Sequence, residues 1–185
     1  MRDAAEASSA EAPAGGAAGA EALSAQEQAA ELDRDGFRVG SPGLAARDRV
    51  IRADLSEAAL QQHSAEDGVW GQEAGAVVGF SGIVRNHDDG RSVERLSYTA
   101  HPQAADRLRE VAQGIAGQYP GVRVWVSHRV GALEVGDHAL VAAIAAAHRA
   151  EAFAACAELI EQVKAEVPIW KEQFFSDGTR EWVGL

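Results

Sequence analysis

Lys164-Ala-Glu-Val-Pro-Ile-Trp-Lys171 is the stretch of this chain in which a long helix has to end and an extended segment has to begin. Apolar residues recur at helical spacing from about Arg149 onward. Pro168 ends the helix, because proline has no N–H to donate and forces the residue before it out of the helical region. We therefore predict a helix over residues 149–167 that leads directly into an extended segment beginning at Ile169.

Both lysines of the chain lie in this segment, whereas the other fifteen of its 17 cationic residues are arginines. An amine can lose its proton and a guanidinium cannot, so a lysine kept in an arginine-rich chain indicates proton transfer or nucleophilic chemistry. On a 3.6-residue wheel, Lys164 shares a sector with Phe153, Ala157 and Ile160, which predicts that it projects from the apolar stripe of the helix. A partly desolvated amine beside other cations has a lowered pKa. Chance and codon bias are the alternative for the lysine pair, and a stem lying along apolar surface with its ammonium group in water is the alternative for Lys164.

The chain from about residue 47 onward alternates between strand and helix patterns. Strands are predicted at residues 50–55, 76–85, 93–100, 122–127 and 139–147. Helices are predicted at residues 56–61, capped by Ser56, and at residues 102–118, opened by Pro102. Gly82 interrupts the second strand and indicates either a bulge or a point of close approach by another segment. The turn sequence Asn86-His-Asp-Asp-Gly90 predicts that strands 76–85 and 93–100 form a hairpin with Arg85 at its mouth.

Size and composition limit the classes of protein to which this chain can belong. Its 185 residues suit one domain, which we place at residues 47–185, after an Ala/Glu/Gly-rich segment at residues 1–46 that we predict to be a disordered tail. The formal net charge of -11 argues against nucleic-acid binding, because phosphate backbones are held by basic surfaces. The single cysteine, Cys156, excludes an internal disulfide and a cysteine-rich zinc site. Since the sequence has no apolar run of transmembrane length and no secretory signal, we expect a cytoplasmic protein that does not bind membranes.

Four motifs follow one another between about Gly75 and Val183. They are Phe80-Ser-Gly82-Ile-Val-Arg85-Asn86, His128-Arg129-Val-Gly131-Ala-Leu133-Glu-Val-Gly136-Asp137, Ala147-His148-Arg149-Ala-Glu-Ala-Phe153, and Lys164 followed by Pro168-Ile169-Trp170-Lys171. With these motifs, in this order and at this spacing, the chain resembles the large, catalytic subunit of molybdopterin synthase. The resemblance covers nearly the whole predicted domain.

The resemblance implies an α+β fold of the hammerhead type, with an antiparallel sheet and packed helices. It also implies sulfur transfer from a small ubiquitin-like carrier subunit, which bears a thiocarboxylate at its C-terminal glycine. By the same resemblance, we expect cyclic pyranopterin monophosphate as the acceptor and the molybdopterin dithiolene of the molybdenum cofactor as the product. The resemblance further implies that two large subunits form a homodimer at the centre of a heterotetramer with two small subunits. We expect neither a cofactor nor a metal ligand in this chain.

The resemblance assigns the candidate site to five residues. Lys164 is the expected principal catalytic residue, for acid–base work or for a transient bond to the acyl group of the carrier, and Lys171 is expected to orient the thiocarboxylate or the pterin. Arg85, His148 and Arg149 are expected to bind the substrate phosphate, because arginine contacts phosphate with two nitrogens and a helix start offers unpaired N–H groups. Alternatively, Arg85 only closes the hairpin electrostatically, and His148 is only a structural hydrogen-bond partner.

This chain departs from the family pattern at several positions. It has Leu96-Ser97-Tyr98-Thr99-Ala100 where the family has Leu-Glu-Tyr-Glu-Ala, and Glu172-Gln173 where the family has a basic residue and Glu after the second lysine. The lost carboxylates motivate a second hypothesis, a non-catalytic binding module for the C-terminal tail of a ubiquitin-like sulfur carrier. A third hypothesis is an unrelated Schiff-base enzyme that uses Lys164.

Overall fold

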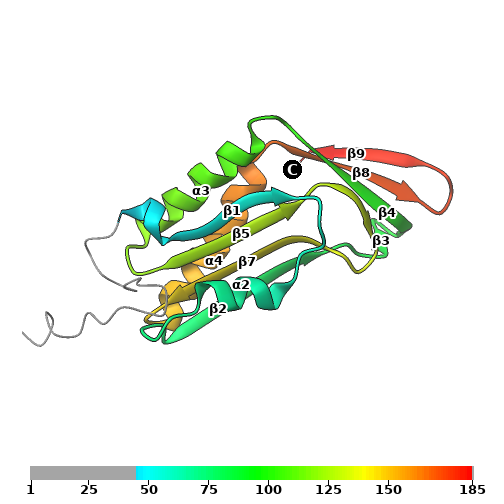
Figure 1. Cartoon of the computed structure of the whole chain (residues 1–185). Helices are drawn as coiled ribbons and strands as arrows, with labels where there is room; N and C mark the ends of the chain where they lie inside the picture. The colour runs from blue at the N-terminus through cyan, green and yellow to red at the C-terminus, as the bar shows by residue number, and fades with distance from the viewer. Residues whose placement is uncertain (1–44, 185) are drawn as a thin grey trace, which may run out of the picture. The chain divides into compact units, whose positions relative to one another are not determined.

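The computed structural model in Figure 1 describes residues 45–184. The predicted tail at residues 1–46 lies outside this range except for its last two residues. The helices of the described part are the 3-10 turn η1 (Ala46–Arg49), α2 (Gln62–Val69), α3 (Ala104–Gln118) and α4 (Arg149–Glu166). Its strands are β1 (Val50–Ser56), β2 (Ala76–Ile83), β3 (His87–Asp88), β4 (Arg91–Ala100), β5 (Arg123–Arg129), β6 (Gly131–Glu134), β7 (His138–Ala146), β8 (Ile169–Phe175) and β9 (Arg180–Gly184).

Four of these strands form a sheet in the order β1-β5-β7-β2. β1 runs parallel to β5, and the other two pairs are antiparallel. α2 packs on one face of the sheet, and α3 and α4 pack on the other (Figure 1). Because helices cover both faces, β5 is buried along its whole length and β7 is buried after its first residue.

Two hydrophobic clusters hold the helices on this sheet. The larger cluster joins the sheet to α3 and α4 and includes the fully buried Leu108, Ile115 and Leu159. The smaller cluster lies under α2, where Val69 belongs with Trp125 of the sheet. Burying a large apolar side chain stabilises the fold by about 1.5 to 3 kcal/mol. The packing on both faces therefore fixes α4, which carries Lys164, to a rigid support.

The remaining strands form a second sheet, in which β4 lies between β6 and β8 and β9 pairs with the far side of β8. The chain leaves the first sheet after β5 and enters the second at Gly131, whose φ is +85°. It turns back toward β7 at Gly136, whose φ is +96°. Residues with a side chain rarely adopt these angles, so the backbone path explains both glycines of the motif that begins at His128.

The predicted α+β class, the bulge after Gly82 and the helices at residues 102–118 and 149–167 are confirmed, with small shifts at their ends. The predicted hairpin between residues 76–85 and 93–100 is wrong. β2 instead pairs along its length with β7, where helices cover it on both faces. A tight hairpin does form after it, but only between β3 and β4, with positive φ angles in the turn.

The predicted helix at residues 56–61 is also wrong. Ser56 is the last residue of β1, and its hydroxyl oxygen accepts a hydrogen bond of 3.1 Å from the backbone N–H of Ala58. Serine can close such a local turn as readily as it can cap a helix. The helix begins only at Gln62.

Gly75 lies just before β2, and we expect a Gly75→Ala variant to be destabilised by about 2 kcal/mol. A Cβ atom at Gly75 would lie 2.3 Å from the carbonyl oxygen of Ala147, and this oxygen belongs to backbone that cannot rotate away. The edge of the sheet would have to shift, and with it the start of α4. Chemical denaturation measures the loss of stability.

Gly114→Ala is the matched control for this substitution. A Cβ atom at Gly114 meets nothing within 4 Å, on an exposed position of α3. Alanine favours helix over glycine, so this variant should gain about 0.5 to 1 kcal/mol. A Gly75→Ala variant that is as stable as wild type, or more stable, would contradict the predicted clash.

Candidate functional site

Two adjoining cavities lie where the two sheets meet. The first has a volume of about 150 Å³ and is lined by residues of β2, β4, β5, β7 and α4, among them Lys164. The second has a volume of about 80 Å³ and is lined by residues of β3, β4, β8, the end of β2 and the connection after it, among them Arg85 and Lys171. Ile83 and Tyr98 line both cavities. Three of the five predicted site residues thus lie around one composite hollow.

Lys164 lies in the last turn of α4, at the edge of the buried face of the helix. The buried residues of α4 are Ala152, Ala155, Cys156, Leu159, Ile160 and Val163. The predicted stripe is therefore wrong in part, because Phe153 is 62% exposed and Ala157 is exposed as well. The face of the helix that packs on the sheet includes the small residues Ala152 and Ala155, and Phe153 therefore lies on the opposite, exposed face. Lys164 is itself exposed, so the expected partial desolvation of its amine is not found. It directly follows the buried Val163 and lines the first cavity from its rim.

The first cavity also holds two polar rings that the sequence analysis did not assign to the site. His128 is 3% exposed, and its Nδ1 lies 2.7 Å from the carbonyl oxygen of Arg129. Because a carbonyl only accepts, Nδ1 carries the proton, and Nε2 of the neutral ring is an acceptor. Burial lowers the pKa of His128, which favours the neutral ring. The Tyr98 ring packs edge-on against it with the centroids 4.9 Å apart, and burial raises the pKa of Tyr98 to about 12.

In the second cavity, the carboxylate of Asp88 lies between the two predicted cations. Arg85 Nη2 donates a hydrogen bond of 2.9 Å to Asp88 Oδ1, and Lys171 Nζ lies 3.8 Å from Asp88 Oδ2. Gln173 Nε2 donates a hydrogen bond of 2.7 Å to the same Oδ2. This hydrogen bond, followed by the positive charges of Lys171 and Arg85, holds the pKa of Asp88 below its ordinary value. Asp88 is therefore an anion near neutral pH.

Backbone pairing sets the positions of these groups. Tyr98 of β4 is the cross-strand partner of Lys171 of β8, so both side chains lie on the same face of the second sheet. Arg85 follows the buried Val84, whose N–H donates to the carbonyl of Asp137 and whose carbonyl accepts from the N–H of Gly136, each at 2.9 Å. Arg85 and Lys171 thus extend from firmly held backbone.

The lost carboxylates at positions 97 and 99 do not face the cavities. Ser97 and Thr99 alternate with Tyr98 along β4 and therefore point to the opposite face of the sheet. Their cross-strand neighbours are Glu172 and Trp170, and Trp170 is 41% exposed. The departures from the family pattern at these two positions change the outer face of the second sheet and leave the charge of the cavities unaltered.

His148 and Arg149 lie at the other end of α4. The predicted helix start is confirmed, since His148 is the N-cap and Arg149 the first helical residue. At 1.5 Å of rise per residue, Arg149 and Lys164 are about 22 Å apart along the helix axis. Both residues of the N-terminal pair are exposed, and neither lines the two cavities. A single chain therefore does not bring His148 and Arg149 to the lysines.

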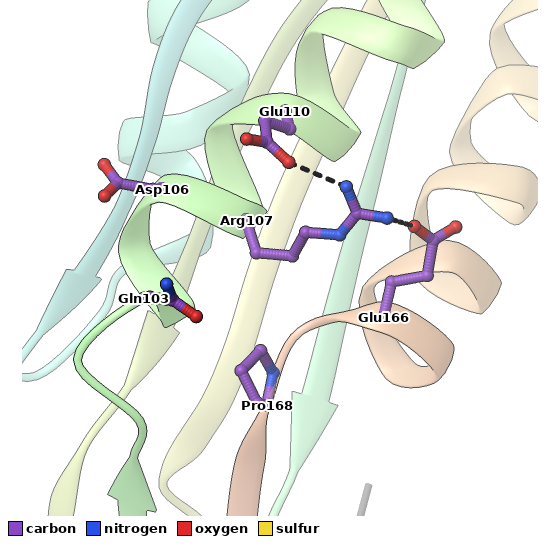
Figure 2. Close-up of a pocket in the computed structure, with 6 residues that line it drawn as sticks. All are labelled: Gln103, Asp106, Arg107, Glu110, Glu166 and Pro168. Carbon is purple, nitrogen blue, oxygen red and sulfur yellow. Dashed lines mark hydrogen bonds and ion pairs between the residues drawn. The ribbon is translucent and has the colours of Figure 1, made fainter.

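A larger hollow of about 400 Å³ lies elsewhere, between α3 and the end of α4 (Figure 2). In it, the Arg107 guanidinium donates to Glu110 at 2.7 Å and also pairs with Glu166. The hydrogen bond that Arg107 donates to Glu110, followed by the negative charge of Glu166, raises the pKa of Arg107. With Asp106 also in its lining, this hollow has three carboxylates against one guanidinium. Like charges repel, so the hollow is unsuited to a phosphorylated substrate.

The composite hollow has the groups that a reaction on an anionic substrate needs. Lys171 and Arg85 supply positive charge, Lys164 supplies an ammonium group, and His128 and Tyr98 supply a polar wall in an apolar cavity. Among residues 45–184, no group of three or more His, Cys, Asp or Glu side chains lies in position to hold a metal ion. The fold and the site together define an α+β protein with ammonium and guanidinium groups around a small, partly apolar hollow.

The chain belongs to the MoaE protein family, which it matches over residues 52–166. The molybdopterin synthase catalytic subunit 1 of Mycobacterium tuberculosis is 48% identical over 117 residues, which are 63% of this chain and 79% of the relative. The crystal structure of molybdopterin synthase from Staphylococcus aureus superposes with a TM-score of 0.68 at 31% identity, covering 72% of this chain and 97% of the other. A complex of subunits 1 and 2 of the molybdopterin-converting factor from Helicobacter pylori contains a chain with the same fold, at a TM-score of 0.55 and 20% identity over 70% of this chain and 88% of that one.

These matches confirm the resemblance, the fold that it implies, and the expectation of an enzyme of the molybdopterin synthase catalytic-subunit family. The family match ends at residue 166, so it includes Lys164 and leaves out Lys171. In the described part of the chain, no helix is both long enough and apolar enough to cross a membrane.

Proposed function

We propose that this protein transfers sulfur from a thiocarboxylated small carrier subunit to cyclic pyranopterin monophosphate and so forms the dithiolene of molybdopterin. The observation that carries the proposal is that Lys164 and Lys171 line adjoining cavities in a chain of the MoaE family. Two sulfurs must be added to one phosphorylated substrate, and adjoining cavities suit a substrate that is held while it reacts. The buried free thiol of Cys156 fits the reducing cytoplasm in which we place this reaction.

Each residue then has a chemical task. The thiocarboxylate sulfur forms a bond to a substrate carbon, and the oxygen that leaves this carbon needs a proton, which we assign to the Lys164 ammonium group. Hydrolysis of the acyl–sulfur bond then leaves the sulfur on the substrate and releases the carrier with a carboxylate at its C-terminus. A transient bond between the Lys164 amine and the carrier's acyl group is the other role open to it. Lys171 and Arg85 orient the anionic groups of the carrier and the substrate in the second cavity.

We further propose that the enzyme is a homodimer within a heterotetramer and that His148 and Arg149 reach the hollow from the second copy. The supporting observation is the distance of about 22 Å between the two ends of α4, which separates them from Lys164 in one chain. An exposed arginine at a helix start suits a phosphate group. The Helicobacter pylori complex of subunits 1 and 2, which shares the fold, supports a small-subunit partner.

Reconstitution tests the reaction. Purified protein is mixed with a thiocarboxylated ubiquitin-like carrier and cyclic pyranopterin monophosphate, and dithiolene formation is followed over time. We expect product in the complete mixture and none when the carrier lacks its thiocarboxylate. Calorimetry with each component separates this function from the binding-module alternative, because the outer face changed at Ser97 and Thr99 would then bind the carrier while the hollow binds no pterin.

A further inference from the structure

Asp88 contacts both cations of the second cavity, although it belongs to a two-residue strand outside the first sheet. Its Oδ1 accepts from Arg85 at 2.9 Å, and its Oδ2 lies 3.8 Å from Lys171 Nζ. Arg85 comes from the connection after β2 and Lys171 from β8, so the carboxylate joins two segments that are distant in the sequence. The side chain of Lys171 is only 18% exposed, which keeps the pair partly shielded from water.

Gln173 completes the arrangement from the same face of β8 as Lys171. Its Nε2 donates to Asp88 Oδ2 at 2.7 Å. An amide can donate to a carboxylate, whereas the Glu of the family pattern at this position would bring a second anion against the first. In this chain, therefore, the carboxylate of the cluster is on β3 and its amide partner is on β8.

We propose that Asp88 is a positioning residue, which holds Arg85 and Lys171 in the geometry that binds the anionic groups of the carrier and the substrate. This inference rests on the proposed function. One carboxylate between two cations leaves the cluster positive, so an anion is still attracted to it. Without the carboxylate, the two cations repel each other and their long side chains regain rotational freedom, which has to be lost again on binding.

The competing explanation is that Asp88 only stabilises the hairpin between β3 and β4. An Asp88→Asn variant distinguishes the positioning role from the structural one. The amide oxygen of asparagine still accepts the hydrogen bond from Gln173, whereas the negative charge is lost. Asp89→Asn is the matched control. It makes the same chemical change one residue further, at an exposed turn position with φ of +46°, which asparagine tolerates well.

The test compares wild type, Asp88→Asn, Gln173→Glu, the exchanged pair carrying both substitutions, and Asp89→Asn in the reconstituted reaction. We expect kcat/KM to fall about tenfold in each single variant of the pair, because the cations are misplaced relative to the substrate. The exchanged pair restores one carboxylate and one amide, and it should return to within about threefold of wild type. Asp89→Asn and wild type should be alike, and thermal unfolding should give similar Tm values throughout.

Wild-type kcat/KM in Asp88→Asn overturns the proposal. An exchanged pair that stays impaired also overturns it, because one carboxylate and one amide in the cluster would then not be enough to position the two cations. If wild type itself forms no dithiolene, the proposed function fails, and a second measurement judges the role of Asp88 alone. The chain has only two lysines, so protein labelled with 13Cε-lysine gives two NMR signals, which a Lys171→Arg variant assigns. The Lys171 signal should shift and narrow in Asp88→Asn. An unchanged signal would contradict the proposal that Asp88 positions Lys171.

Discussion

A Lys164→Ala variant is expected to lose dithiolene formation by a factor of about 10² to 10⁴, the usual contribution of a positioned proton donor. The loss should appear in kcat, because the proposed proton transfer occurs only after the substrate is bound. Lys164→Arg should fail almost as badly, since the guanidinium keeps the positive charge but cannot release a proton. Steady-state measurements with both carrier and pterin at saturating concentration give kcat.

Because Lys164 is exposed, substituting it should change the reaction without disturbing the fold. Its side chain is outside the buried face of α4, so neither variant should lower Tm noticeably. Glu161→Ala is the matched control, because Glu161 is exposed on the same helix one turn earlier. If Lys164→Ala and Glu161→Ala react at the same rate as wild type, Lys164 is not the proton donor. If Lys164→Arg alone retains the rate, the side chain acts through its charge.

Local patterns were sufficient to predict α4 and its end. Helical periodicity and a proline are properties of adjacent residues, and α4 ends at Glu166, two residues before Pro168. The local pattern at β7 was ambiguous, because its alanines favour a helix while Val141 and Ile144 favour a strand, and the predicted strand is the one that forms. These elements are consistent with their tertiary surroundings, which is the condition under which local prediction succeeds.

Strand pairing was not predictable from such patterns. The turn at Asn86 to Gly90 does form a hairpin, but the turn sequence says nothing of how far the two strands stay paired. β2 finds its partner in β7, more than fifty residues away, and there it contacts α2 and α4 on its two faces. A turn sequence predicts where the chain reverses direction. Which strands pair in the sheet depends on the apolar surface that each pairing buries.

Which residues line the composite hollow was predictable only in part, for the same reason. Lys164, Lys171 and Arg85 stood out by residue type and by motif, and the cavities bring them together. The sequence predicts Asp88 only as a turn residue and His128 only as part of a motif. Their contacts with the hollow depend on which strands meet there, and local sequence does not determine that. Two signals pointed toward Asp88: its place three residues after Arg85 and the unexpected amide at Gln173.

Mixing two inactive variants should restore activity if His148 and Arg149 of one copy act with the lysines of the other. Arg149→Ala and Lys164→Ala are each expected to be nearly inactive as pure dimers, because every site lacks one of the two groups. In a mixed dimer with two-fold symmetry, one site carries both substitutions and the other carries none. Random reassortment makes half of the dimers mixed, and each has one intact site, so the mixture should recover about a quarter of wild-type activity.

The pair Lys164→Ala and Lys171→Ala is the control for this experiment. The structure places both lysines around the hollow of one chain, so a mixed dimer of these two variants has no intact site and should recover nothing. Recovery with Arg149→Ala but not with Lys171→Ala thus requires a site shared between copies. If the first mixture stays inactive although mass spectrometry shows mixed dimers, Arg149 does not act across the dimer. The distance of about 22 Å along α4 then leaves it no route to Lys164, and its role as a ligand of the substrate phosphate has to be given up.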